Sequence, residues 1–198
     1  MCLVRLPCFR GESRMTHAVT FETSRLSLLP WTDDYGRELA RIYADPEVIV
    51  QTTFRRPLSR NESMEVSARS CLLWQDYGFG PWAAIEKVSG NWVGRIGLNL
   101  LVDWPLEDKW EVGWLLDRQY WGRGLATEGG QAGLRFGFGA AKLERIISVT
   151  IPDNIRSRRV IEKCGLTYQG ELTWRKSDVV WYAIDRTAWT EIEAELTG

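Results

Sequence analysis

The alternation of apolar and polar residues divides the chain into strands and helices. Alternation with period two predicts strands, whereas apolar residues three and four positions apart predict helices. The predicted strands are 24–31, 82–87, 92–101, 110–116, 145–151, 166–169 and 179–184. The predicted helices are 33–44, with Thr32 or Asp33 as N-cap, then 62–75, 125–138, 155–163 and 187–196. Strands and helices interleave without repeats or linkers, so the pattern predicts one mixed α/β domain.

The junction between the fourth predicted strand and the next helix carries a candidate anion site. Gly122 and Gly124 lie in the turn that connects strand 110–116 to helix 125–138. The first N–H groups of a helix have no intrahelical acceptor, and the helix dipole is positive there, so phosphate oxygens bind well at such a point. Glycine lets a bulky anion reach the backbone. An ordinary strand–turn–helix joint is the alternative interpretation.

The helix after this turn contains four glycines that disfavour helix formation. Each of them costs up to about 1 kcal/mol relative to alanine. They are Gly129, Gly130, Gly133 and Gly137. We therefore expect close contact of this helix with the sheet or with a ligand to compensate.

Composition and charge exclude several classes of protein. The 198 residues contain 25 Lys and Arg and 26 Asp and Glu, and the net charge of −1 argues against a general nucleic-acid-binding protein. The charge is uneven, because residues 118–159 carry eight bases and three acids. This excess surrounds the candidate phosphate site, although a solvated helix face would produce the same excess.

The cysteines, the single histidine and the apolar runs predict neither a metal site nor a membrane span. The four cysteines are scattered without a Cys-x-x-Cys pair, and His17 is the one histidine. No apolar run reaches the length of a membrane-spanning helix. We expect a cytoplasmic protein without metal, with residues 1–18 as an N-terminal appendage and residues 19–198 as a single domain.

Two common nucleotide-binding loops do not match this sequence. A dinucleotide fingerprint requires a third glycine where Thr127 stands, and an acidic residue at the end of the next strand, whereas Glu144 precedes that strand. A P-loop requires Gly-Lys-Ser/Thr after the glycines, and that tripeptide does not occur.

Two patterns in register resemble a known enzyme family. The first is Gln119-x-x-Gly122-x-Gly124, and the second runs from Asn154-x-x-Ser157 to Glu-Lys-Cys-Gly165. Together they resemble the GNAT superfamily of acyl-CoA-dependent N-acetyltransferases, and within it the RimJ/RimL-like branch of ribosomal-protein N-acetyltransferases. Further similar segments lie, in the expected order, at 24–29, 45–48, 93–98 and 181–189. The resemblance implies the GNAT fold: a central, mostly antiparallel sheet with splayed fourth and fifth strands, flanked by helices.

The resemblance also implies acetyl-CoA as cosubstrate and assigns the residues that bind it. Pantetheine would lie between the splayed strands, the turn would hold the pyrophosphate through main-chain N–H groups, and Asn154 would contact pantetheine with its amide. The implied binding residues are Trp114, Leu115, Leu116, Gln119, Gly122, Arg123, Gly124, Leu125, Ala126 and Asn154. A helix N-cap is the other role that suits Asn154.

Acetyl transfer to an amine requires a base and an oxyanion donor. A lysine-type amine, with a pKa near ~10.4, is almost fully charged at neutral pH and attacks only after losing a proton. Glu111, in an apolar strand, is the candidate base, because desolvation would raise its pKa. A solvated glutamate at the start of a strand is the alternative. The backbone N–H of Trp114 or Leu115 is the expected oxyanion donor.

The departing CoA thiolate also needs a proton. Many GNAT enzymes supply it from a tyrosine seven residues after the asparagine, but that position is Ile161 here. The Rim-type pattern suggests Ser157 instead, and a plain first-turn serine is the alternative. Cys164 has no histidine to activate it, so we expect a buried structural thiol.

The sequence thus predicts an N-acetyltransferase that acts by direct attack in a ternary complex. The acceptor would be a primary amine, either a protein N-terminal α-amine or a small molecule, and the protein a monomer or homodimer. The acidic turn 103–108 is one place where a cationic amine could bind. The competing hypothesis is a non-catalytic acyl-CoA-binding module, which the missing tyrosine would permit.

Overall fold

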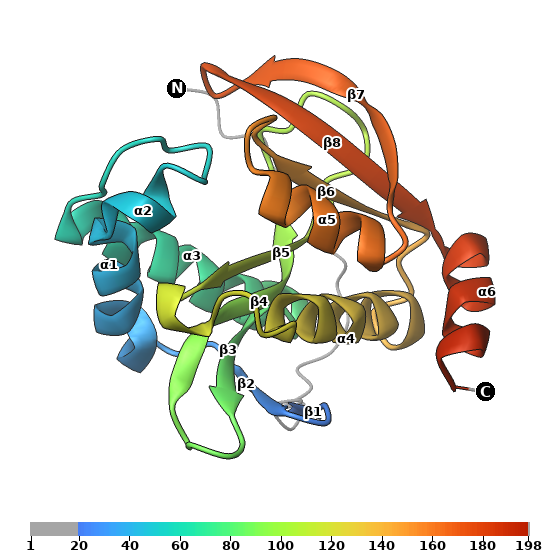
Figure 1. The fold of residues 1–198 in the computed structure, drawn as a ribbon, viewed down its shortest axis with the longest axis horizontal. Coiled ribbons are helices and arrows are strands. Elements are labelled where there is room, and N and C mark those ends of the chain that lie inside the picture. The colour runs from blue at the N-terminus through green and yellow to red at the C-terminus, as the bar shows by residue number, and fades with distance from the viewer. Residues whose placement is uncertain (1–19, 198) are drawn as a thin grey trace.

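The computed structural model describes residues 20–197 and forms one eight-stranded sheet flanked by helices (Figure 1). The strands are β1 (Phe21–Glu22), β2 (Leu26–Pro30), β3 (Pro81–Glu86), β4 (Trp92–Leu100), β5 (Trp110–Leu116), β6 (Arg145–Thr150), β7 (Thr167–Trp174) and β8 (Ser177–Asp185). Their order across the sheet is β1-β2-β3-β4-β5-β6-β8-β7. All neighbours are antiparallel except β5 and β6. The predicted mixed α/β fold with a mostly antiparallel sheet is confirmed; the predicted appendage, 1–18, lies outside the described residues.

Helices cover both faces of this sheet. They are α1 (Gly36–Ala44), α2 (Pro46–Ile49), α3 (Arg60–Tyr77), α4 (Leu125–Gly139), α5 (Ile155–Lys163) and α6 (Arg186–Thr197). Successive side chains of β4 point to opposite faces: Arg95 reaches Ser70 on α3, whereas Ile96 contacts α4 at Gly129. Therefore α1 and α3 cover one face, and α4 with α5 covers the other (Figure 1).

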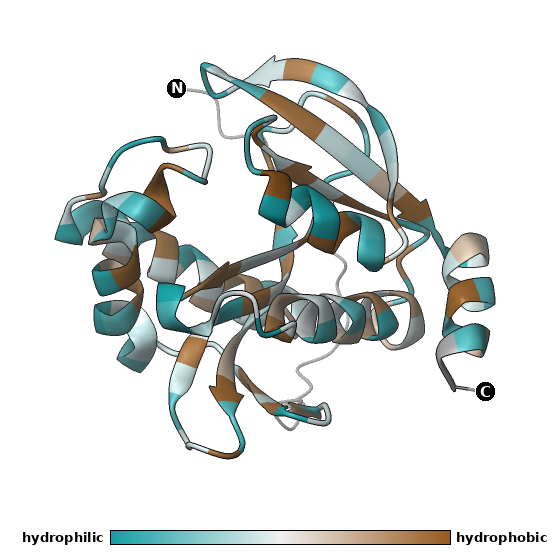
Figure 2. Ribbon diagram, viewed as in Figure 1, coloured by the Kyte–Doolittle hydropathy of each residue, from teal (hydrophilic) through white to brown (hydrophobic). Residues whose placement is uncertain are grey.

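A hydrophobic core fills the space on each side of the sheet. Under α4 it contains fully buried Trp82, Ile96 and Leu98, and under α1 and α3 it contains Leu39 and Ile42. Apolar residues accordingly dominate the central strands, while the outer surfaces of the helices are polar (Figure 2). Each such buried side chain stabilises the fold by roughly 1.5–3 kcal/mol.

The glycines of α4 allow the helix to approach the sheet closely. A Cβ atom on Gly129 would lie 2.6 Å from Cδ1 of Ile96, and one on Gly137 would lie 2.5 Å from Cδ1 of Ile146. Real Cβ atoms do not approach that closely, so side chains there would push α4 away from the strands. The expected compensation for the low helix propensity of this segment is confirmed.

Several short or polar elements differ from the sequence prediction. The first helix does not begin with a capping Thr32 or Asp33: a 3₁₀ turn at 33–35 precedes α1, and Thr32 makes no side-chain cap bond. The two-residue β1 and the four-residue α2 are too short for periodicity to reveal. β7 extends to Trp174 because it pairs along β8, despite its largely exposed sequence.

The strands β5 and β6 diverge, which places a gap in the middle of the sheet. They pair at a single register position, Glu111 with Ile147. On its other side β5 stays paired with β4 along its whole length, from Trp110 to Leu116. The splay that the family resemblance implies between the fourth and fifth predicted strands is therefore present.

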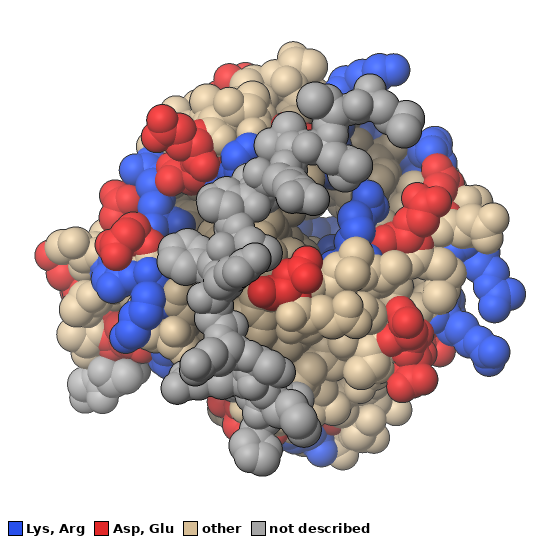
Figure 3. All heavy atoms as spheres, turned by 180° about the vertical axis from the view of Figure 1, so that it is seen from behind, with Lys and Arg blue, Asp and Glu red and all other residues tan. Residues whose placement is uncertain are grey.

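Charges of both signs mix on the surface opposite to the view of Figure 1. Outside the area covered by undescribed residues, acidic and basic side chains alternate there without a large patch of one sign (Figure 3). In residues 20–197, no helix combines the length and the apolar character that a membrane span requires.

Candidate active site

The gap between β5 and β6 exposes backbone groups of β5. At the end of the β4–β5 ladder, Asp117 N donates to Val93 O (3.0 Å). Bonded and non-bonded pairs alternate along antiparallel strands, so Leu115 exchanges its hydrogen bonds with β4. Trp114 and Leu116 direct their N–H and C=O groups into the gap. The register thus assigns a free edge to Trp114 and Leu116, and turns the backbone of Leu115 away from it.

Neighbouring side chains occupy part of this free edge. Ser148 Oγ donates to Val112 O (2.9 Å), and the indole Nε1 of Trp121 donates to Leu116 O (2.9 Å). The N–H and C=O groups of Trp114 lie between these two positions and have no partner in residues 20–197. Trp114 is therefore the backbone position best placed to pair with an extended ligand.

A cavity of about 850 Å³ occupies this gap. It is lined on one side by the first turn of α4 and by α5, and on the other by α3, the segment after α2 and the sheet. Its size suits a small-molecule or cofactor site. The cavity reaches both faces of the sheet, so two molecules could meet in it from opposite sides.

The turn before α4 presents backbone to the cavity. Gly122 and Gly124 have φ values of 73° and 78°, a left-handed conformation that favours glycine. No atom lies within 4 Å of a Cβ built on Gly122, so the space beside it is open. Both glycines line the cavity, as do Leu125 and Ala126 in the first turn of α4, whose N–H groups lack intrahelical acceptors.

Two predicted residues of this turn do not line the cavity. Gln119 donates from its backbone N–H to Asp117 Oδ1 (3.3 Å). The guanidinium of Arg123 pairs with Glu86 on β3 and lies 5.5 Å from the ring centre of Tyr120. Both residues shape the turn from outside.

Glu111 lies inside the cavity at the point where the strands separate. Its Oε1 accepts a hydrogen bond from the backbone N–H of Val149 (3.3 Å), an N–H that the splay frees from the ladder. Loss of water around the carboxylate raises its pKa from 4.5 to about 7, although the Val149 hydrogen bond and the charges of Arg95 and Arg175 oppose the rise. The pKa of Glu111 is thus raised by desolvation, as expected from the sequence, and its role as a base stays a prediction.

Space beside Glu111 depends on Gly113, which sequence reasoning missed. A Cβ on Gly113 would lie 3.4 Å from Oε2 of Glu111 and 3.3 Å from Nδ2 of Asn99. The missing side chain keeps the carboxylate accessible from the cavity. The signal was present, since a glycine inside a strand often marks a close approach.

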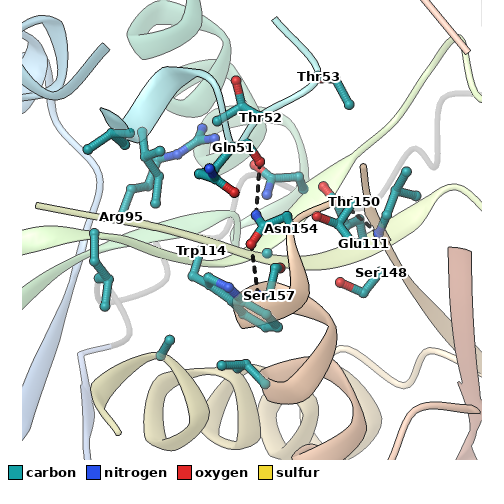
Figure 4. Close-up of a pocket in the computed structure, with 18 of the residues that line it drawn as sticks. Gln51, Thr52, Thr53, Arg95, Glu111, Trp114, Ser148, Thr150, Asn154 and Ser157 are labelled. Carbon is teal, nitrogen blue, oxygen red and sulfur yellow. Dashed lines mark hydrogen bonds between the residues drawn. The ribbon is translucent and has the colours of Figure 1, made fainter. Parts of the chain in front are cut away.

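Asn154 joins two walls of the cavity. Its Oδ1 accepts from Ser157 N (3.0 Å), which makes it the N-cap of α5, and its Nδ2 donates to the carbonyl of Gln51 (2.9 Å) (Figure 4). The N-cap role is therefore present. Ser157 lies one turn along the helix and lines the cavity, while Glu111 lies beside Ser148 and Thr150 (Figure 4).

Cys164 is buried and has no role in the cavity. Desolvation raises its pKa to about 12, so the thiolate is not available as a nucleophile. Its Sγ would be 2.9 Å from a Cβ on Gly130, which places it between α4 and α5. The expectation of a buried structural thiol is confirmed.

Basic side chains of α5 line the same side of the cavity as the glycine turn. They are Arg156, Arg159 and Lys163, and Arg156 also lies 5.1 Å from the ring centre of Trp121. Sequence analysis found this positive charge only as an excess over residues 118–159. The fold brings this charge beside the glycine turn, where it would suit a ligand with several phosphates.

The comparison with protein families decides the identity. The model of the acetyltransferase (GNAT) domain matches residues 25–167. The chain belongs to the GNAT acetyltransferase family. It is therefore an acetyl-CoA-dependent N-acetyltransferase.

Individual relatives agree with this assignment. The FsC-acetyl coenzyme A-N(2)-transacetylase of Aspergillus fumigatus is 29% identical over 88% of this chain and 79% of its own length. An acetyltransferase from Agrobacterium tumefaciens has a similar structure, with a TM-score of 0.73, 25% identity, and 88% and 99% of the two chains covered. RimL, the ribosomal L7/L12 α-N-protein acetyltransferase solved with coenzyme A, shares the fold with a TM-score of 0.67 and 18% identity. The alignment covers 82% of this chain and 95% of RimL.

Proposed function

We propose that this GNAT enzyme binds acetyl-CoA on the α4–α5 side of the cavity and a primary amine on the α3 side. The observation that carries the proposal is a single cavity that joins the open N-terminus of α4 to a desolvated carboxylate, Glu111. The amine attacks the thioester directly in a ternary complex. The N–C bond forms, the C–S bond breaks, and coenzyme A leaves as the thiol.

On the donor side, main-chain groups hold the cosubstrate. The N–H groups of Gly122, Gly124, Leu125 and Ala126 bind the pyrophosphate, because their acceptors are missing and the dipole of α4 is positive there. Trp114 and Leu116 face the pantetheine arm from β5. Gln119 and Arg123 support the turn. The side-chain amide of Asn154 donates to the carbonyl of Gln51, so Asn154 contacts the pantetheine arm only if this amide also donates to the arm.

On the acceptor side, Glu111 takes the proton from the amine. A pKa near 7 leaves much of the carboxylate ionised at neutral pH and matches a general base to that pH. The N–H of Trp114 stabilises the oxyanion that develops on the thioester, since it points into the gap. Leu115 is not a donor for this oxyanion, because its N–H faces β4.

Ser157 donates a proton to the departing thiolate, directly or through water. Its hydroxyl lines the cavity and has no hydrogen-bond partner in residues 20–197, so it is available to a ligand. Ile161 is fully buried, so the position at which many family members use tyrosine faces the core instead.

The acceptor is a primary amine, either a protein N-terminal α-amine or a small-molecule amine. RimL itself is similar at only 18% identity, which speaks for the fold and not for the acceptor. We further propose a cytoplasmic enzyme whose domain spans 19–198 and which works as a monomer or homodimer.

Thiol release from acetyl-CoA across a panel of primary amines tests the proposal. An enzyme releases thiol in proportion to acetylated amine, and does so slowly without an acceptor. A non-catalytic acyl-CoA-binding module would bind coenzyme A and release no amine-dependent thiol, and that result would overturn the proposed activity.

A further inference from the structure

The α3 side of the cavity carries an excess of positive charge. Its charged side chains are Glu47, Arg69, Arg95, Glu111 and Arg175. Two of them are already neutralised: Glu47 pairs with Arg118, and Arg175 forms a bidentate pair with Asp103, with both N–O distances 2.7 Å. Arg69 and Arg95 remain, opposite a single carboxylate whose pKa is near 7.

Arg95 is held in place without a charged partner. Its Nη1 donates to Ser70 Oγ (2.9 Å), and that buried hydroxyl donates in turn to Val66 O (3.1 Å). In the described part of the chain, no carboxylate forms an ion pair with Arg95. A guanidinium has five N–H donors, so those that Ser70 does not occupy are available to an anion in the cavity that Arg95 lines.

Arg95 and Glu111 lie on the same face of the sheet. The register pairs Arg95 with Leu115 and Asn99 with Glu111, and directly opposite residues share a face. All four therefore face α3, and the charge of Arg95 reaches far enough to act on Glu111. Arg69, on α3, is close enough to Asp103 to lower the pKa of that carboxyl, after the larger effect of Arg175.

Two of the three acids in the turn that the sequence offered for a cationic amine are already paired. Asp103 is bound by Arg175, and Asp108 pairs with Arg145 Nε at 3.1 Å. The third acid, Glu107, is exposed and does not line the cavity. Among the described residues that line the cavity, a polycationic acceptor would therefore meet Arg69 and Arg95 with Glu111 as the only unpaired carboxylate. Like charges in one desolvated cavity repel, so this wall selects against such acceptors.

We propose that the acceptor is a small primary amine that also carries an anionic group, with the amine at Glu111 and the anion at Arg95. This inference rests on the proposed function and names its substrate class. A carboxylate and a phosphate monoester both offer two anionic oxygens that can accept a bidentate pair of hydrogen bonds from a guanidinium. The transfer itself is unchanged: the amine proton goes to Glu111, and coenzyme A leaves as the thiol.

Matched amines test the proposal by changing only the distal group. Glycine, β-alanine and 4-aminobutanoate vary the distance between the amine and the carboxylate. In β-alaninamide the negative charge of the carboxylate is removed, and in 1,3-diaminopropane a positive charge takes its place. The compound 2-aminoethyl phosphate carries a phosphate in place of the carboxylate. Rates are compared per concentration of neutral amine. We expect the best carboxylate or phosphate to exceed the amide in kcat/KM by about ten-fold to a hundred-fold, as for a hydrogen bond to a charged group. Equal values for charged and amide acceptors would overturn the proposal.

The variant Arg95→Gln assigns the preference to this residue. We expect the ratio of kcat/KM for the anionic amine to kcat/KM for the amide to fall by that factor, because any effect of the lost charge on Glu111 is common to both acceptors. The Kd of acetyl-CoA should be unchanged. Arg37→Gln, which removes an exposed arginine on α1 outside the cavity, should keep the preference. A preference that persists in Arg95→Gln would overturn the assignment.

A binding measurement separates failure of this proposal from failure of the proposed function. In the presence of coenzyme A, N-acetyl-β-alanine should stabilise the wild type more than N-acetyl-β-alaninamide does, and this difference should vanish in Arg95→Gln. That result without any turnover would support the anion site and contradict the catalytic function. Turnover without any difference between the two products would contradict the anion site alone.

Discussion

At the scale of single residues, burial prepares Glu111 before any acceptor arrives. The splay of β5 from β6 removes water from the carboxylate and leaves it one backbone donor, Val149. The folded protein therefore holds the proton of Glu111 to a higher pH than an exposed glutamate would. A base of this strength accepts a proton from an ammonium group more readily than an ordinary carboxylate.

Glu111→Gln should lower turnover by roughly 10²-fold or more, because glutamine keeps the size of the side chain and cannot accept the proton. In the wild type, kcat should rise with pH through about 7 as the carboxylate ionises, and the variant should lack this limb. The loss should shrink at high pH, where the amine deprotonates without help. Glu107→Gln, in an exposed turn, is the matched control and should behave as wild type. An unchanged rate of Glu111→Gln at neutral pH would leave Glu111 a purely structural role.

Ser157→Ala should lower kcat by a modest factor, on the order of ten to a hundred, with little change in the affinity for acetyl-CoA. The factor is modest because a thiol has a pKa near ~8.5, so its anion leaves even without full protonation. Steady-state rates and the Kd of acetyl-CoA, measured on the same preparation, decide the role. Weaker binding at full kcat would make Ser157 a contact of the cosubstrate and leave water as the proton source.

Single residues also show what sequence alone could and could not predict about the site. Glu111 and the glycine turn were predicted because their neighbours in the chain define their environment. Arg95 and Gly113 were not, because their importance arises from the β4–β5 register, which brings them to the same wall as Glu111. Gln51 enters the site only through its carbonyl, which carries no side-chain signature.

At the scale of elements, α4 connects the proposed donor site to the core. Its glycines bring the helix onto β4 and β6, and its first turn then lies at the mouth of the gap. The position of the proposed pyrophosphate site is thus fixed by the contact between helix and sheet.

Gly129→Ala should destabilise the fold by about 1–3 kcal/mol, because its Cβ would lie 2.6 Å from Ile96 Cδ1 and the surrounding core cannot yield freely. Gly139→Ala, at the end of the same helix, has no atom within 4 Å of the added Cβ and should be neutral or slightly stabilising. Urea unfolding of both variants measures the difference. Equal free energies of unfolding for the two variants would show that α4 does not depend on this close contact.

The elements that sequence predicted best are those with a strong period and buried partners. The predicted bounds of β5 and α5 equal those in the structure, and α4 ends one residue after its predicted end. α3 begins two residues before its predicted start, with Ser59 and Glu62 forming a capping box that the sequence already contained. β7 was too short in the prediction because Gly170, with φ 148°, and polar neighbours hide a strand that β8 stabilises.

At the scale of the whole molecule, the sheet separates two chemical environments. The α4–α5 side carries main-chain donors and basic side chains, which suit the proposed phosphorylated donor, whereas the α3 side carries Glu111 and Arg95, which we propose bind the acceptor. The net charge of the protein is close to zero, so this arrangement is local and not a property of the overall field. The splayed strands are the one place where both environments meet.

The central claim is that this cavity binds coenzyme A, and thermal unfolding with saturating ligand tests it most directly. A ligand that binds the folded state raises its stability by mass action, so coenzyme A should raise the Tm, while NAD, at the same concentration, should not. Gly122→Val should lose the rise, because a branched side chain is strained at φ 73° and would fill the open space beside the turn. Equal shifts with coenzyme A and NAD, or no shift with coenzyme A at saturation, would contradict the account.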